Sequence, residues 1–336
     1  MEITMKKANK LLSNWGVASK KALFSGLVLV LLVAAFSILK PSLFLAQGNI
    51  INVLQQVVTY SIIGFGLTFC LICGGTDLSA GSSMALSGII VVYLLGQGLP
   101  LWVCILLCLA MGIMTGILNG FTIEILGVVP FIATLGTQWV YRGMANVLVK
   151  GAPIYTNTIP EQAVRDQFYV LGGGRMTSII PGLPYSVIIT LVYGLILAVL
   201  LAKTRVGRQI YACGSNLEAA KLSGINAVRT RMFAYCVSGF SAAICGILVA
   251  SRVSSASPTA GTGYELEAIA AAVLGGVSNN GGEGNILNTI IGALIMGVLR
   301  NGLNLNGVNS FWQQMIIGAI LVGACAIEAR RQRKRG

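Results

Sequence analysis

Thr204–Arg231, with the sequence TRVGRQIYACGSNLEAAKLSGINAVRTR, is a polar and basic stretch between two long apolar segments. Together with Lys203 it holds six of the 23 Lys and Arg residues of the chain. Basic residues that flank apolar segments mark the cytoplasmic side of a membrane protein. We therefore expect the stretch to be a cytoplasmic loop, and the apolar segments on both sides to enter a membrane.

The composition supports a membrane protein. The chain has 336 residues, of which 55% are hydrophobic and only 10% charged, and its mean hydropathy is +0.82. Soluble domains carry about 25% charged residues. This chain has too little polar surface to cover a water-soluble globule. The apolar runs are long and lack the alternation of a transmembrane barrel, so they predict an all-α polytopic protein.

The basic residues predict the orientation. Sixteen of the 23 Lys and Arg lie in Lys6–Lys21, Lys203–Arg231 and Arg330–Arg335. These clusters place both termini and the central loop in the cytoplasm, and they do not indicate nucleic-acid binding. The N-terminus lacks a small-residue cleavage site, so its first apolar run is expected to be a retained span. We expect one transmembrane domain over 1–336, with cytoplasmic segments at 1–21, 203–231 and 328–336.

The apolar runs predict about ten transmembrane helices, six before the central loop and four after it, since about 20 apolar residues cross a bilayer. Even numbers on both sides agree with the predicted orientation. Pro41–Gln56 and Lys150–Pro184 are expected to be outside connections. The predicted spans are Ala22–Leu39, Val57–Cys73, the segment from the following glycine-rich break to Leu95, Leu101–Ile123, Phe131–Val149, Tyr185–Leu201, Met232–Ala250, Glu265–Gly276 with its flanks, Ile286–Leu303 and Phe311–Ile327.

One acidic residue lies in the break between the second and third spans. Asp77 follows Gly74-Gly75 and lies near Thr76 and Ser79. Charges inside a membrane are costly and commonly functional. One interpretation is a discontinuous helix whose Thr76, Asp77 and Ser79 line a polar pathway. The other is that Asp77 caps the next helix, and the sequence leaves both open.

Polar and aromatic residues gather on the fifth span. Thr134, Gln138, Trp139 and Arg142 offer an aromatic ring, an amide and hydrogen-bond donors, which suit sugar recognition in a pathway. An interfacial aromatic belt is the alternative.

Elsewhere, Gly112-x3-Gly116-x3-Gly120 predicts close helix packing. Glu265 and Glu267 are expected to act at a helix N-terminus. The sequence indicates no partner for Arg300.

Motifs of catalysis are missing from the sequence. It contains no G-x-x-x-x-G-K-[ST] phosphate loop, no H-E-x-x-H and no His at all. Cys70-x-x-Cys73 stands alone, which is typical of buried and unreactive cysteines. We expect no catalytic residue, no metal site and no cofactor bound by this chain.

The central loop contains a predicted docking helix. Asn216 is a suitable N-cap and Gly224 a suitable end, with Glu218 and Lys221 three residues apart between them. Leu217 and Leu222 would leave an apolar patch for a partner. An ordinary interfacial helix is the alternative.

The loop motif Glu218-Ala219-Ala220-x3-Gly224 resembles the segment by which permeases of ATP-binding-cassette importers contact their ATPase. Further stretches resemble monosaccharide permeases of the ribose, galactose, arabinose and xylose systems over roughly residues 22–328. The ribose type is the most similar, while Thr76 and Ala80 are also similar to galactose-type members, which leaves the sugar open. These stretches are Gly74–Gly81, Thr134–Thr137, Thr204–Arg208, Pro258–Leu266 and Leu274–Ser278.

The resemblance implies a type II-like ABC importer permease in the cytoplasmic membrane of a prokaryote, importing ribose or a related pentose or hexose. It implies an ATPase partner that uses ATP and Mg²⁺, an extracytoplasmic sugar-binding protein and a second permease chain, expected to be identical. Coupling to the ATPase would use Asn216, Glu218, Ala219, Ala220, Lys221 and Gly224. The alternative is an ion-coupled secondary transporter of a small polar solute, for which Asp77 is the one strong candidate residue.

Overall fold

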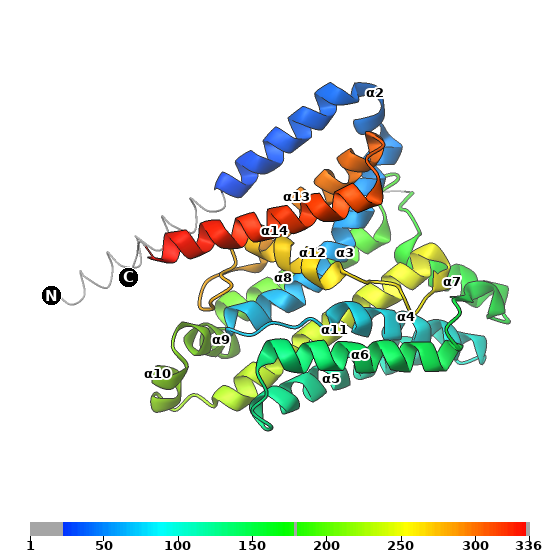
Figure 1. Cartoon of the computed structure of the whole chain (residues 1–336). Coiled ribbons are helices and arrows are strands. Elements are labelled where there is room, and N and C mark those ends of the chain that lie inside the picture. Colours follow the sequence, from blue (N-terminus) through cyan, green and yellow to red (C-terminus); the bar gives the residue numbers. More distant parts are fainter. Residues whose placement is uncertain (1–22, 178–179, 334–336) are drawn as a thin grey trace.

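A computed structural model describes residues 23–177 and 180–333. They form a bundle of helices, most of which lie roughly along one common axis (Figure 1). The first basic cluster, Lys6–Lys21, and the end of the last one lie outside these residues. The described helices are Leu23–Leu39, α2 (Pro41–Phe44), α3 (Gln47–Ile72), α4 (Ala80–Gly96), α5 (Leu101–Glu124), α6 (Pro130–Val149), α7 (Gln162–Gly172), α8 (Tyr185–Lys203), α9 (Arg205–Ser215), α10 (Leu217–Leu222), α11 (Ala227–Val253), α12 (Tyr264–Leu274), α13 (Ile286–Leu305) and α14 (Ser310–Arg333).

The predicted all-helical polytopic fold is confirmed. A helix lies at each of the ten predicted spans, and α3, α5, α8, α11 and α13 are long and apolar enough to cross a membrane alone. The other regular elements are a 3₁₀ turn, η1 (Thr156–Thr158), and a short antiparallel pair of strands, β1 (Ile154–Tyr155) and β2 (Ser255–Ala256).

The predicted connector Pro41–Gln56, with its amphipathic end Ile50–Gln56, is too long, and the predicted span at Val57 begins too late. Helix α3 begins at Gln47 and continues for 26 residues, so Ile50–Gln56 forms its first turns. The segment Gln47–Ile72 contains no proline, and its polar residue Asn49 pairs with Asn301 rather than ending the helix. Only the short segment with α2 remains of the connector.

The predicted eighth span is not a complete transmembrane helix. Helix α12 has 11 residues, which corresponds to about 16 Å at 1.5 Å per residue, against a hydrocarbon core of about 30 Å. Residues 254–263 leave the end of α11 and return into the bundle, where α12 begins (Figure 1). Gly261 and Gly263 have positive φ angles, which favour glycine and end regular structure before Tyr264.

Helix α11 packs at the centre of the bundle against α3, α4 and α5. The predicted glycine face of α5 makes the contact with α5 possible. A Cβ on Gly112 would lie 2.5 Å from the carbonyl oxygen of Gly239, and one on Gly116 would collide with that of Tyr235. The helix backbones therefore touch, as the Gly-x3-Gly spacing predicts.

The central loop lies at the same end of the bundle as the start of the first described helix and the end of α14 (Figure 1). Figure 1 shows the N-terminal end of the first described helix (dark blue) and the C-terminal end of α14 (red) on the same side of the molecule as α9 and α10. Even numbers of crossings on both sides of the loop require this arrangement. That this end faces the cytoplasm remains a prediction from the basic residues.

Candidate functional site

The central loop forms two helices rather than one. In α10, Asn216 Oδ1 accepts a hydrogen bond from the Ala219 N–H at 2.9 Å, so Asn216 caps the helix as its residue type predicts. Gly224 has a φ of +80° just beyond the end of the helix, where a residue with a Cβ would be strained. Lys221 Nζ donates to Glu218 Oε1 at 2.9 Å along the exposed face.

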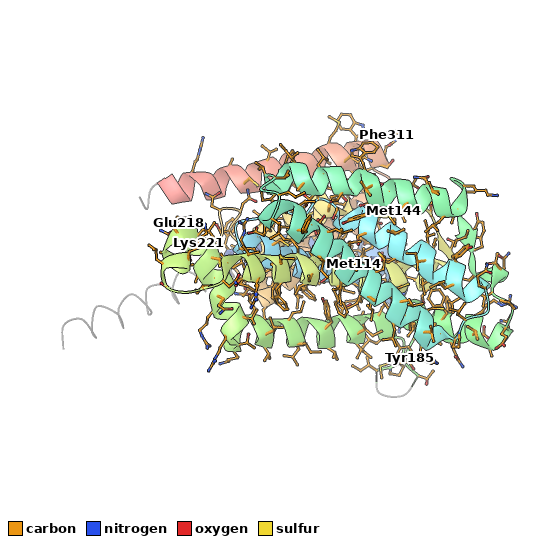
Figure 2. The ribbon with its side chains drawn as sticks, turned by 90° about the horizontal axis from the view of Figure 1, so that it is seen from below. Met114, Met144, Tyr185, Glu218, Lys221 and Phe311 are labelled. Carbon is orange, nitrogen blue, oxygen red and sulfur yellow. The ribbon has the colours of Figure 1, made fainter. Side chains whose placement is uncertain are left out.

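Helix α10 has one anchored face and one free face. Ala220 is buried against Cys213 and Ala227, whereas Glu218 and Lys221 project at the end of the molecule (Figure 2). Leu222 is 90% exposed. The predicted apolar patch is therefore wrong for Leu217, which packs on the anchored face. Leu222 is its only member.

Helix α9 joins α10 to the bundle. Its residue Tyr211 donates from Oη to the carbonyl oxygen of Gly284 at 2.5 Å, and burial raises the pKa of this phenol to about 12. The same loop donates from Gly282 N to the carbonyl oxygen of Ile72 at 2.8 Å, at the end of α3. Hydrogen bonds thus connect α9 through this loop to the end of α3, next to the break between α3 and α4.

A second connection lies at the start of α11. Arg231 Nη1 lies 3.0 Å from Glu124 Oε1, and the two side chains are 14% and 7% exposed. This ion pair fastens the end of α5 to the first turn of α11 that follows the central loop. Burial makes it costly to separate.

The glycine-rich break between α3 and α4 surrounds a buried carboxylate. Asp77 is 1% exposed. Its Oδ1 accepts hydrogen bonds from Ser79 N (2.9 Å), Ser79 Oγ (2.6 Å) and Asn119 Nδ2 (3.2 Å), and its Oδ2 accepts one from Ser238 Oγ (2.6 Å). These donors compensate the cost of burying the charge. Protein groups from α5 and α11 therefore hold the break together.

The capping prediction for Asp77 needs a correction in detail. Helix α4 begins at Ala80 with Ser79 as its N-cap residue, and the backbone bond from Ser79 N to Asp77 lies one residue before the helix. The carboxylate stabilises the turn ahead of α4 and not the first N–H groups inside it.

Asn119 is the residue that sequence reasoning missed. Its amide donates to Asp77 and to Ser79 Oγ (2.8 Å), while its Oδ1 accepts from Thr137 Oγ1 (2.6 Å) and Tyr141 Oη (3.3 Å). It joins the break to α5 and α6 at once. The available signal was an amide side chain between Gly116 and Gly120, in the middle of an apolar span.

A second polar centre lies where α6 meets the loop before α12. Arg142 Nη1 donates to the carbonyl oxygens of Pro258 (2.5 Å) and Ala260 (2.7 Å). Gln138 Nε2 lies 3.4 Å from Glu265 Oε1, which also accepts from Gly263 N at 3.3 Å. Within 23–177 and 180–333, the buried atoms Arg142 Nη2 and Glu265 Oε2 have no hydrogen-bond partner.

The structure thus brings most of the predicted pathway residues together. Thr134 is buried and donates to the carbonyl oxygens of Pro130 (2.9 Å) and Thr76 (3.5 Å), beside the Asp77 network. Gln138 and Arg142 follow on the next turns of α6. Trp139 is 74% exposed and does not join them, because its position on α6 points to the outside of the bundle.

Arg300, for which the sequence indicated no partner, is paired. Its Nη1 lies 2.5 and 2.7 Å from the two carboxylate oxygens of Glu267 and 3.0 Å from Tyr60 Oη. Glu267 therefore acts in an ion pair between α12 and α13. Glu265 bonds to Gly263 N at the N-terminus of α12, which agrees with the predicted role at a helix start.

Comparison with known proteins gives a consistent result. Residues 49–325 match the family model described as the permease component of branched-chain amino acid transport systems. The ribose import permease of Haemophilus influenzae is 40% identical over 76% of each chain. The D-allose transport permease of Escherichia coli K12 is 34% identical over 75% of this chain and 74% of its own. The galactose/methyl galactoside import permease of H. influenzae is 35% identical over 74% and 76%. No solved structure shows a significant match to the chain.

Proposed function

The chain belongs to the family of permease components of branched-chain amino acid transport systems, and we propose that it is the permease of an ATP-driven importer that carries a monosaccharide. It is a multi-pass protein of the prokaryotic inner membrane. The observation that carries the proposal is the similarity, over 74% to 76% of this chain, to three permeases named for ribose, allose and galactose. Ribose is the proposed sugar, because ribose permeases show the highest of these identities.

Energy enters at α10 in this proposal. The free face of Glu218, Lys221 and Leu222 is the docking surface for an ATPase subunit, which binds ATP and Mg²⁺ in place of this chain. Asn216 and Gly224 fix the two ends of the helix, Ala220 packs on its anchored side, and the small side chain of Ala219 belongs to the exposed surface. The bonds of α9 to Gly284 support transmission of movement from this surface to the helix break.

The sugar passes beside the two broken elements in the same proposal. The start of α4 and the start of α12 lie against each other inside the bundle, at Gly81 and Gly261. Beside Gln138, Arg142 and Glu265 offer an unpaired donor and an unpaired acceptor there, within the residues that the structure describes. The network of Thr76, Asp77, Ser79 and Thr134 shapes this passage rather than binding the sugar through Asp77, because protein donors already occupy the carboxylate of Asp77.

The proposed assembly contains further chains. An extracytoplasmic binding protein delivers the sugar to the end opposite α10, and a second, identical permease completes the pathway. The alternative of an ion-coupled transporter is not favoured. Its strongest candidate, Asp77, is held by four hydrogen bonds, and the relatives named above are permeases of sugar systems.

The test is reconstitution. We expect uptake of radiolabelled ribose into proteoliposomes that hold the permease and its ATPase, with binding protein and ATP supplied on the appropriate sides. Uptake should survive an uncoupler and stop when the ATPase is omitted. Uptake that an uncoupler abolishes and that proceeds without the ATPase would refute the proposal and establish ion coupling.

A further inference from the structure

A polar cavity of about 420 Å³ lies between the first turns of α3 and the last turns of α11 and α13. It is lined by six Asn and Gln side chains together with Arg252 and Leu305. Gln56 in this cavity and Ile72 at the α9 end of α3 are 16 residues apart, which is about 24 Å along a helix. The cavity therefore lies at the end of the bundle away from α10.

The floor of the cavity is a hydrogen-bonded pair of asparagines. Asn49 and Asn301 are 9% and 5% exposed and exchange two hydrogen bonds, Asn49 Nδ2 to Asn301 Oδ1 at 3.0 Å and Asn301 Nδ2 to Asn49 Oδ1 at 2.8 Å. Asn49 also donates to the carbonyl oxygen of Phe44. This pair connects α3 to α13 and leaves the remaining side chains to face a ligand.

The wall of the cavity offers a free hydrogen-bond acceptor, and its rim carries exposed carboxamides. Gln56 Oε1 is buried and has no partner among the residues that the structure describes. Arg252 Nη1 donates to the carbonyl oxygen of Gln55 at 3.0 Å, which holds the guanidinium against the wall. Asn52 and Asn304 are exposed and stand at the rim, where Asn304 Oδ1 accepts from Gln313 Nε2 at 2.7 Å. Burial thus increases from rim to floor.

The chemistry of these groups selects a neutral, hydroxylated ligand. A carboxamide both donates and accepts, and so does a hydroxyl group, so a ring of hydroxyls can pair with several carboxamides at once. The lining contains no acidic side chain, which disfavours a cation. The volume lies within the range of about 300 to 1,000 Å³ that small-molecule sites occupy.

We propose that this cavity is an entry site for a neutral monosaccharide on its way into the permease. The site binds weakly, with a Kd of about 1 mM or higher, because its groups exchange water for sugar hydroxyls at little net gain. Weak binding suits a transit site, which must release its ligand. The direction of transit rests on the proposed import function, whereas binding of free sugar does not.

The test measures binding to the full-length permease alone, in nanodiscs, by saturation-transfer difference NMR with free ribose and free galactose. We expect a signal from wild type that falls at least 5-fold in Gln56→Met and in Asn52→Leu. Asn52 is exposed, so Asn52→Leu should fold normally. It therefore still tests the site if Gln56→Met, which changes a buried group, does not fold. Gln162→Leu, a carboxamide on α7 that does not line the cavity, is the matched control.

Three results would overturn the proposal: no transfer to either sugar, equal transfer in all variants, or an equal loss in Gln162→Leu. Stronger competition by ribose 5-phosphate, lost in Arg252→Met, would also overturn it and identify an anion site. Uptake assays on the same preparations separate the two proposals. Normal uptake without binding at this cavity removes the entry site and leaves import intact, whereas binding without uptake keeps the site and removes the import function.

Discussion

The backbone of Gly81 lies against that of Gly261, although 180 residues separate them. A Cβ on Gly261 would lie 2.7 Å from the carbonyl oxygen of Gly81, and a Cβ on Gly81 would collide with the carbonyl oxygen of Gly261. The contact joins the start of α4 to the loop before α12. Two helices that begin inside the bundle therefore meet at their N-termini, and glycine is what allows the approach.

Replacing Gly81 should separate the two broken elements. We expect Gly81→Val to abolish uptake and to lower the thermal unfolding temperature, because the new side chain would collide with the backbone carbonyl of Gly261, which cannot rotate away as the end of a side chain can. Gly98→Val is the control for adding bulk where no atom lies within 4 Å, although its positive φ of 82° adds local strain. Unchanged uptake in Gly81→Val would show that this contact is not needed for transport.

Removing the amide of Asn119 should destabilise the network around Asp77. Asn119→Leu removes an acceptor from Thr137 and Tyr141 and one donor from Asp77, at a total cost of about 1 to 3 kcal/mol, because the two hydroxyls keep the carbonyl oxygens of Thr134 and Thr115. Asn119→Asp should do no better, since it places a second carboxylate beside Asp77. Thermal unfolding of the purified variants measures both.

The control for this prediction is Asn146→Leu. Asn146 is an exposed amide that donates only to the carbonyl oxygen of Arg142 in its own helix. Its loss should cost less than about 0.5 kcal/mol. Equal destabilisation by the changes at Asn119 and Asn146 would contradict the assigned role of Asn119.

A substitution on the exposed face of α10 should weaken coupling to the ATPase without affecting folding. The pair Glu218–Lys221 is exposed, so it contributes at most about 1 kcal/mol to stability. We expect Glu218→Ala to insert and unfold like wild type while its ATPase-driven uptake falls several-fold. Uptake at the wild-type rate in this variant would exclude Glu218 from coupling.

The exposed face of α10 can be probed by labelling. Leu222→Cys should react rapidly with a water-soluble maleimide, because Leu222 is 90% exposed, and bound ATPase should protect it. The native Cys213 should react slowly in the same experiment, since it is 3% exposed and burial raises the pKa of its thiol. Full labelling at position 222 in the presence of saturating ATPase would place the docking surface elsewhere.

The ion pair of Arg300 with Glu267 should contribute to the stability of α12. Breaking a buried pair costs about 3 to 5 kcal/mol, but 33% of the Arg300 side chain is exposed. We therefore expect Glu267→Gln to cost about 2 kcal/mol. A double-mutant cycle with Arg300→Met measures the coupling, and a coupling near zero would show that the pair is formed without stabilising the fold.

How far the sequence predicts this fold can be seen at α5 and α12. The predicted bounds of helix α5 agree with the structure to within one residue, because a proline and an apolar run define its ends. Three glycines at i, i+4 and i+8 indicate which of its faces packs against another helix. Helix α12 was predicted as a span and is half of one. A hydrophobic run does not show how long the helix is when a loop such as 254–263 makes part of the membrane crossing. The turns of that loop depend on contact with α4 and α6.

The candidate site divides in the same way. Asn216, Glu218 and Gly224 could be assigned from the sequence because a helix cap and a helix end depend on neighbouring residues only. Asn119, and the pairing of Glu267 with Arg300, could not be, because each interaction joins helices that are far apart in the chain. Trp139 shows the limit within one helix, since the sequence places it one residue from Gln138 but does not say which side faces the bundle.

The sequence by itself determined that the chain is an α-helical membrane protein, where ten helical segments lie, and that a capped helix stands in the basic loop. Those properties follow from hydrophobicity, charge and local backbone preferences. Only the tertiary structure decided that the segment around Gly81 and the loop at Gly261 meet inside the bundle, that Asp77 is enclosed by Asn119 and Ser238, and that a ring of carboxamides forms a cavity. These features depend on which helix faces which, and long-range packing settles that.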